Sequence, residues 1–241
     1  MAGSAAISVV VPVKDEAGNV APLAREIAAA LAGEPDHEII FVDDGSSDGT
    51  PSALVALKSE IPGLRVLRHD RNQGQSRSIR TGVQAARGGT IVTLDGDGQN
   101  DPADIPRLLA ALRAEDDVGL VSGVRVKRQD TASRRIASKL GNGFRNLMLG
   151  DGATDTGCGL KVFRRQLFLD LPYFDHIHRF LIALALREGW QVRFVPVNHR
   201  PRLTGTSKYT NFGRMLVSMQ DLMGVRWLQR RHRGRSRADE L

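Results

Sequence analysis

The first half of the chain alternates short β-branched runs with segments of helical periodicity. Residues 7–13 (ISVVVPV) form a continuous apolar run, which is typical of a strand buried on both faces. Residues 20–31 follow with apolar side chains at helical spacing, and Pro22 stands early, where a helix tolerates proline. This alternation continues to residue 126 and predicts a mostly parallel sheet with helices on both faces. The predicted strands are 7–13, 38–42, 64–67, 90–94 and 118–126, and the predicted helices are 20–31, 50–59, 75–86 and 103–114.

The second half is less regular. Its last segment, residues 212–229, has apolar residues at helical spacing and predicts an amphipathic helix that runs into an arginine-rich tail. No internal repeat and no clear linker divides the chain. The other predicted elements are helices at 133–149 and 178–188, strands at 160–163 and 191–197, and a loop at 200–211.

Charge and composition exclude several classes of protein. The chain of 241 residues has a formal net charge of +7, but residues 226–241 hold six arginines against two carboxylates, so the rest carries only +3. With 12 aromatic residues as well, stacking platforms for nucleic acid are scarce, and we expect no nucleic-acid partner. The single cysteine, Cys158, excludes an internal disulfide and a cysteine-built zinc site. No run reaches the roughly 18 uncharged apolar residues that a membrane span needs, which favours a cytoplasmic location.

Acidic loops follow three of the predicted strands. They are residues 14–16 (KDE), 43–50 (DDGSSDGT) and 95–99 (DGDGQ). Since ligands of open α/β sheets bind beyond the carboxyl ends of the strands, these carboxylates should gather at one edge. Carboxylates that crowd together repel, so a divalent cation is a natural occupant, although an isolated Asp-Gly-Asp is also common in solvated turns.

The usual glycine-rich phosphate loops are absent. Neither GxxxxGK[ST] nor a G-x-G-x-x-G after the first strand occurs in the sequence. A nucleotide bound at this sheet would therefore need a metal ion and basic side chains to hold its diphosphate.

The motifs resemble those of a known family when they are taken in order. VVVPVKDE, IIFVDDGSSDGT, N-x-G at 72–74 and TLDGDGQNDP are similar to family 2 glycosyltransferases of the GT-A fold. GVR at 123–125, D-x-x-x-G at 155–159 and RLTGTSKY at 202–209 are similar to polyprenyl-phosphate glycosyltransferases of the dolichol-phosphate mannosyltransferase type. The resemblance covers roughly residues 7 to 215. It implies a Rossmann-like GT-A catalytic domain over 1–211, followed by the helix and tail over 212–241.

The resemblance implies a donor site and a metal site at the acidic loops. Asp95 and Asp97 would form the D-x-D pair at the donor diphosphate, with Gln99 completing the shell of a Mg²⁺ or Mn²⁺ ion. Gly96 stands where relatives often have alanine, and Lys14 stands where some have an aromatic residue, so guanine and uracil both remain open as the base. The implied donor-binding residues are Pro12, Lys14, Glu16, Val42, Asp44, Asp95, Gly96, Asp97 and Lys208.

The resemblance also implies an acceptor site. Arg125, Arg134 and Ser138 would meet the phosphate of a polyprenyl acceptor, and Arg125 and Arg202 would join Asp97 as catalytic residues. The implied reaction is inverting sugar transfer from a nucleotide-diphosphate donor, GDP-mannose or a UDP-sugar, to a dolichyl- or undecaprenyl-type phosphate in cell-envelope glycan synthesis.

A second interpretation keeps the fold and changes the acceptor to a soluble saccharide or protein. A sugar hydroxyl would then need a general base, for which Asp155 is the candidate. His176 and His178 have no further His or Cys beside them in the sequence, so we do not expect a metal site there. Cys158 lacks an obvious base partner and is expected to be a small buried residue.

The final helix has two possible uses. Its apolar residues and the RWLQRRHRGRSR segment suit a helix that rests peripherally on the inner face of the cytoplasmic membrane. The same spacing suits packing on the protein core, and periodicity alone does not separate the two. Pairing of such helices in a homo-oligomer also stays open.

Overall fold

A computed structural model of the chain describes residues 7–126, 143–201, 211–232 and 234. Within these residues, seven strands form one mixed sheet in the order β3-β2-β1-β4-β6-β5-β7. The strands are β1 (Ile7–Val13), β2 (His37–Asp43), β3 (Leu64–Arg68), β4 (Thr90–Thr93), β5 (Val118–Arg125), β6 (Lys161–Arg164) and β7 (Gln191–Val197).

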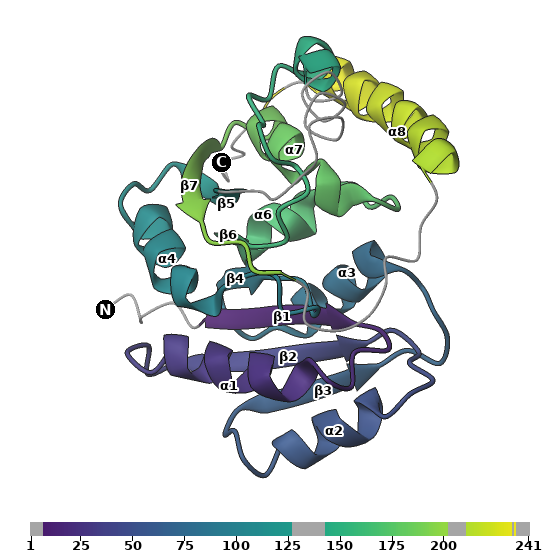
Figure 1. The fold of residues 1–241 in the computed structure, drawn as a ribbon. Coiled ribbons are helices and arrows are strands. Elements are labelled where there is room, and N and C mark those ends of the chain that lie inside the picture. Colours follow the sequence, from purple (N-terminus) through teal and green to yellow (C-terminus); the bar gives the residue numbers. More distant parts are fainter. Residues whose placement is uncertain (1–6, 127–142, 202–210, 233, 235–241) are drawn as a thin grey trace, which may run out of the picture.

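Helices connect the strands and cover both faces of the sheet (Figure 1). Short 3₁₀ turns at Pro102–Asp104 (η1) and Ile177–Arg179 (η2) precede two of the helices, and residues 143–149 are also helical. The labelled helices are α1 (Val20–Ala30), α2 (Thr50–Leu57), α3 (Gln75–Ala85), α4 (Ile105–Arg113), α6 (Arg165–Asp170), α7 (Leu181–Arg187) and α8 (Asn211–Arg231).

Each buried strand contributes alternate side chains to two apolar layers. Val9 and Val11 of β1 belong to the apolar layer that contains side chains of α1, α2 and α4, whereas Val10 belongs to the layer that contains side chains of α3, α6, α7 and α8. Successive side chains of a strand point to opposite faces, so a strand that is covered on both sides needs apolar residues throughout. This double burial explains the unbroken ISVVVPV run.

The structure confirms the predicted α/β class and most predicted elements, and it adds one reversal. Strand β6 runs antiparallel to both β4 and β5, while the other paired strands are parallel. Helix α6 was not predicted, and the helix expected at 178–188 starts later, at Leu181, because η2 occupies the preceding residues. The part of the expected 133–149 helix before residue 143 lies outside the described residues.

The reversal of β6 decides what meets the D-x-D loop. In the β4–β6 ladder Thr93 pairs with Lys161, so the start of β6 lies beside the end of β4. The ends of β1, β2, β4, β5 and β7 and the start of β6 therefore share one edge of the sheet. The three acidic loops begin at this edge, so they lie at the same edge of the sheet, as predicted.

Helix α8 lies beside α7 at one end of the molecule (Figure 1). Leu222 and Val225 are buried in the same layer as α7, whereas Met219, Met223 and Trp227 are exposed. The helix thus packs on the core with one face and leaves an apolar stripe on another. Among the described helices, none has both the length and the apolar character needed to cross a bilayer.

Candidate active site

The loop after β4 holds the D-x-D carboxylates. The Asp95 backbone N–H donates to Asn100 Oδ1 over 3.1 Å, and Gln75 Nε2 donates to Asp95 Oδ1 over 2.7 Å. The Gln99 backbone N–H donates to Asp97 Oδ1 over 3.1 Å. Burial, and next the charge of Asp97, raise the pKa of Asp95 to about 6. A cation at this loop would relieve that repulsion.

Two glycines let other backbone segments approach Asp95 and its loop. A Cβ on Gly159 would lie less than 3 Å from the Asp95 carboxylate, and a Cβ on Gly96 would lie 2.9 Å from the Pro12 carbonyl. Neither position can take a side chain without moving the carboxylate loop. The close approach of the Pro12 carbonyl therefore explains why glycine stands at position 96, where the resemblance alone gave no reason.

Arg125 reaches the site from the end of β5 in a fixed orientation. Its Nε and one terminal nitrogen donate to the two oxygens of Asp155, each over 2.7 Å, and both side chains are largely buried. Burial opposes the charged guanidinium, but the hydrogen bonds and charge of Asp155 raise the Arg125 pKa. This bidentate pair fixes a positive charge close enough to stabilise the ionised form of Asp95.

Lys161 is a second cation at the site. It is buried at the start of β6 and donates a hydrogen bond to the Cys158 carbonyl. Burial lowers the Lys161 pKa, while the charges of Cys158 and Asp95 oppose that shift. Cys158 itself is buried, and burial raises its thiol pKa, as befits a packing residue.

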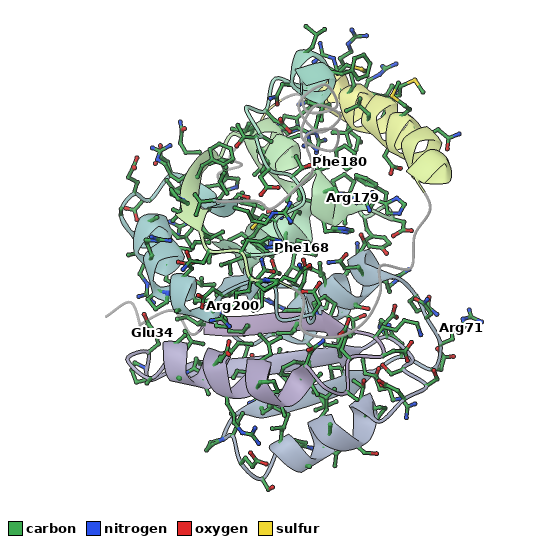
Figure 2. The ribbon with its side chains drawn as sticks, viewed as in Figure 1. Glu34, Arg71, Phe168, Arg179, Phe180 and Arg200 are labelled. Atoms are coloured by element: carbon green, nitrogen blue, oxygen red, sulfur yellow. The ribbon has the colours of Figure 1, made fainter. Side chains whose placement is uncertain are left out.

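A cavity of about 520 Å³ opens from Asp95 toward α8. Its polar end contains Asp95 and Lys161, and its apolar end contains Met219 and Leu222 of α8. Figure 2 labels Arg179 and Phe180, which line it between the sheet and α8. The other lining residues are Gln75, Ile79, Thr93, Leu94, Phe144, Arg145, Thr156, Gly157, Cys158, Gly159, His178 and Leu181.

The predicted nucleotide-binding residues gather at the ends of β1 and β2. Pro12 and Val42 face each other in the parallel register, and the Val42 side chain is fully buried in the core. Lys14 Nζ donates to the Gly45 carbonyl over 3.0 Å, and the Glu16 backbone N–H donates to Thr50 Oγ1 over 2.8 Å. These contacts tie the loop after β1 to the loop after β2.

Asp44 organises the loop that leads to α3. Its Oδ1 contacts His69 Nδ1 at 2.8 Å and accepts from the Gln73 backbone N–H, while its Oδ2 accepts from the Gly74 N–H. Gly74 has φ +88°, a left-handed value that favours glycine, and the next residue is Gln75. Asp44 and Asp95 are therefore linked through one short loop.

Several predicted residues lie outside the part of the chain that the structure describes. They are Arg134, Ser138, Arg202 and Lys208. Their assignment to donor or acceptor phosphates stays a prediction from the resemblance, as do the roles of the described donor and metal residues.

The two histidines have separate partners. His178 Nδ1 lies 2.6 Å from Ser76 Oγ, and burial lowers the His178 pKa to about 3, so its imidazole is neutral. His176 Nδ1 contacts Asp221 Oδ2 of α8 at 2.9 Å. Within the described ranges, no three His, Cys, Asp or Glu side chains come together as a metal cluster.

A divalent cation fits the D-x-D loop only as a partly open site. Asp95, Asp97 and the Gln99 amide offer hard oxygen ligands, and the remaining positions would fall to donor phosphate oxygens, as Mg²⁺ prefers. The raised pKa of Asp95 supports this fit, since burial and next the charge of Asp97 penalise its ionised form, and a bound cation would reduce that penalty.

Sequence reasoning missed Gln75 and Lys161. Gln75 stands directly after the N-x-G motif, and Lys161 follows the D-x-x-x-G motif by two residues. Their proximity to those motifs was a usable signal, but only the fold places both beside Asp95.

Comparisons with known proteins agree with this geometry. Residues 8–171 match the family model for glycosyl transferase family 2. The chain is 38% identical over 221 residues to an undecaprenyl-phosphate 4-deoxy-4-formamido-L-arabinose transferase of Enterobacter sp. (strain 638), covering 90% of this chain and 66% of that protein. It is 34% identical over 235 residues to a dodecaprenyl-phosphate galacturonate synthase of Rhizobium johnstonii, covering 93% and 67%. The chain thus spans about two thirds of the length of these relatives.

Solved structures share the fold. A mannosyltransferase from Pyrobaculum calidifontis in complex with GDP-Man and Mn²⁺ superposes with a TM-score of 0.68 at 18% identity, covering 98% of this chain and 67% of that one. Glucosyl-3-phosphoglycerate synthase from Mycobacterium tuberculosis, in complex with Mn²⁺, UDP-glucose and glycerol 3-phosphate, has the same TM-score and identity, covering 94% and 80%.

Proposed function

The chain belongs to glycosyl transferase family 2, and we propose that it transfers a sugar, with inversion, from a nucleotide-diphosphate donor to a polyprenyl phosphate. The names of the two sequence relatives support this acceptor class. In the reaction, an acceptor phosphate oxygen forms a bond to the anomeric carbon and the nucleoside diphosphate leaves.

One observation carries the choice of acceptor: a single cavity reaches from the Asp95 carboxylate to apolar side chains of α8. Met219, Leu222 and Phe144 line one end, and Lys161 and Asp95 line the other. An aliphatic wall such as Met219 and Leu222 offers no hydrogen bonds to the hydroxyls of a soluble saccharide. A lipid phosphate needs both ends, one for its charge and one for its first isoprene units.

The state of Asp155 argues against the soluble-acceptor alternative. Arg125 engages both oxygens of Asp155, which is 5% exposed, so this carboxylate is poorly placed to accept a proton from a hydroxyl. An acceptor phosphate is already anionic, so it needs positioning more than a base.

We assign the donor roles as the family resemblance implies. Asp95, Asp97 and Gln99 would hold Mg²⁺ or Mn²⁺, which when bound neutralises the leaving diphosphate. Arg125 offers a fixed guanidinium for phosphate oxygens, and a preorganised charge costs no reorientation during the reaction. Arg134 and Ser138 are proposed to hold the acceptor phosphate, and Arg202 and Lys208 to contact phosphates as well.

We further propose that the chain docks on the inner face of the cytoplasmic membrane through an apolar patch. The patch consists of Met219, Met223 and Trp227 on α8 with Phe144 and Leu147 from the helical segment 143–149, all exposed. Leu147 is 83% exposed, which is costly in water. Arg226 and Arg230 line the same groove as Met223 and Trp227 and would meet anionic headgroups.

The test is a donor screen. Purified protein with Mg²⁺ or Mn²⁺ is given radiolabelled GDP-mannose and a panel of UDP-sugars, each with undecaprenyl phosphate in detergent. We expect label in the organic extract with one donor. We expect Asp97→Ala to lose at least about 100-fold of that activity, because a ligand to the diphosphate-bound ion is gone.

The control is Asp116→Ala, which removes an exposed carboxylate far from the D-x-D loop and should leave transfer unchanged. Label that enters only water-soluble products, with every donor, would refute the lipid-phosphate acceptor.

A further inference from the structure

The segment after β7 lies directly on the D-x-D loop. The Arg200 backbone N–H donates to the Gln99 carbonyl over 2.9 Å, and Gln99 Nε2 lies 3.5 Å from the Arg200 carbonyl. His199 and Asn100 form an antiparallel bridge. Asn100 is also the residue whose side chain accepts the Asp95 N–H. Two consecutive residues of this loop, Gln99 and Asn100, are thus connected to the β7 extension.

The Arg200 side chain adds two ion pairs to this attachment. One terminal nitrogen lies 2.6 Å from Glu26 Oε2 of α1, and the other lies 2.6 Å from Asp101 Oδ1. Asp101 also accepts the Ala103 N–H with the same oxygen and so caps η1. Figure 2 shows Arg200 near β1 and α1.

The D-x-D loop has an internal hydrogen bond across Gly98, from the Gln99 backbone N–H to Asp97 Oδ1, but it also needs support from outside. Gly98 has φ +74°, and among the described residues no atom beyond its two chain neighbours lies within 4 Å of where its Cβ would be, so no described side chain packs at this point. A glycine in open space leaves the backbone many conformations. The proposed ligands Asp97 and Gln99 flank this glycine, so their separation depends on where residues 99–101 are held.

We propose that Arg200 is a positioning residue of the donor site, which holds residues 99–101 against α1 and β7 and thereby sets the affinity for the divalent cation. This rests on the proposed function, since it takes Asp97 and Gln99 as cation ligands. Arg200 itself would touch neither the cation nor the donor. It acts as residues behind metal ligands generally do, by orienting them.

The chain provides a closely matched control in Arg193 of β7. Arg193 makes a bidentate pair with Glu115, with nitrogen–oxygen distances of 3.1 and 2.6 Å. The Arg193 and Glu115 side chains are 40% and 47% exposed, against 38% and 44% for Arg200 and Glu26. Both arginines lie at surface ion pairs near β7, but only Arg200 contacts the D-x-D loop.

The experiment measures Mn²⁺ binding directly by electron paramagnetic resonance of the free ion, with Mn²⁺ alone and with UDP or GDP. We expect Arg200→Ala to raise the Mn²⁺ dissociation constant about tenfold, a typical cost of losing support behind a metal ligand. Arg193→Ala should leave it unchanged, and Arg200→Lys, which can keep one ion pair, should fall between. The melting temperatures of the two alanine variants should decrease by similar, small amounts, because both arginines form surface ion pairs.

If Arg200→Ala does not fold, Glu26→Gln weakens one of the two ion pairs and leaves Arg200 in place, with a smaller expected rise in the same constant. An unchanged Mn²⁺ constant in these variants, or an equal rise in Arg193→Ala, would overturn the assignment even if lipid transfer is intact. A tenfold rise in a protein that makes no lipid product would uphold it and refute only the acceptor.

Discussion

At the residue scale, Gly159 is the most sharply constrained position near the carboxylates. An alanine methyl there would lie less than 3 Å from Asp95, whose carboxylate cannot retreat without leaving Gln75. We expect Gly159→Ala to lose about 100-fold in kcat/KM, since a displacement of this size at a reacting centre has that cost.

The comparison variant is Gly224→Ala. Gly224 lies exposed in α8, and no atom of another described segment lies within 4 Å of where its Cβ would be. An alanine in a helix is favoured over glycine by roughly 0.5–1 kcal/mol, so this variant should be slightly more stable and equally active. Equal activity of the two variants would show that Asp95 tolerates displacement.

The buried His178 makes the free energy of unfolding depend on pH, and its lowered pKa sets the direction of that dependence. Its pKa is lowered to about 3 by burial, from 6.5 when unfolded. Between these values the unfolded chain binds a proton that the folded chain does not, so stability falls as pH falls below 6.5. We expect this residue to cost up to about 2 kcal/mol at pH 5 relative to pH 7 or above.

Urea unfolding of the wild type and of His178→Asn at pH 7 and pH 5 measures this effect. The asparagine has no titrating group, so its free energy of unfolding should drop less between the two pH values. The same drop in both proteins would contradict a neutral buried imidazole at pH 5.

At the scale of the element, α8 has one buried face and one exposed apolar face. Leu222 and Val225 are 5% and 1% exposed and pack on the core, while Met223 and Trp227 are 55% and 58% exposed. Helical geometry places the first pair and the second pair on different sides. The sequence allowed core packing or membrane contact; the structure shows core packing by Leu222 and Val225, and membrane contact stays a proposal.

Substitutions on the exposed face should affect membrane binding, whereas substitutions on the buried face should affect stability. Met223→Ala with Trp227→Ala should weaken binding to vesicles of anionic phospholipid at least about tenfold and leave the melting temperature unchanged, because exposed side chains contribute little to folding. Leu222→Ala should cost about 2–5 kcal/mol of stability. Vesicle sedimentation and thermal unfolding measure the two effects, and wild-type vesicle binding by the double variant would argue against the docking proposal.

At the scale of the whole molecule, the strand order assembles the site. Because β6 runs opposite to β4 and β5, Lys161 at its start and Arg125 at the end of β5 meet the loop after β4. Helix α8 then closes the far end of the cavity with Met219 and Leu222. The boundary between residues 211 and 212 stays a prediction, although the packing of Leu222 and Val225 shows that α8 shares the core.

Local sequence patterns were sufficient to predict most of the helices and strands. The β-branched runs and the helical spacing placed β1 and β7 to the residue, and most other elements of the first half to within one or two residues. They succeed because burial of one or two faces of an element requires apolar residues at a regular spacing along the local sequence. The comparisons confirm the family that the motifs indicated, while the role of Asp95 and Asp97 as the D-x-D pair stays a prediction from the resemblance.

The sequence by itself determined the α/β class, the family and which residue types stand after each strand. Only the tertiary structure decided that β6 is reversed, that Gln75 and Lys161 lie beside Asp95, and that Arg200 supports residues 99–101. These contacts join residues 20 to 101 positions apart. A single sequence records periodicity along the chain, whereas the pairing of distant segments is set by the global packing of the sheet and its helices.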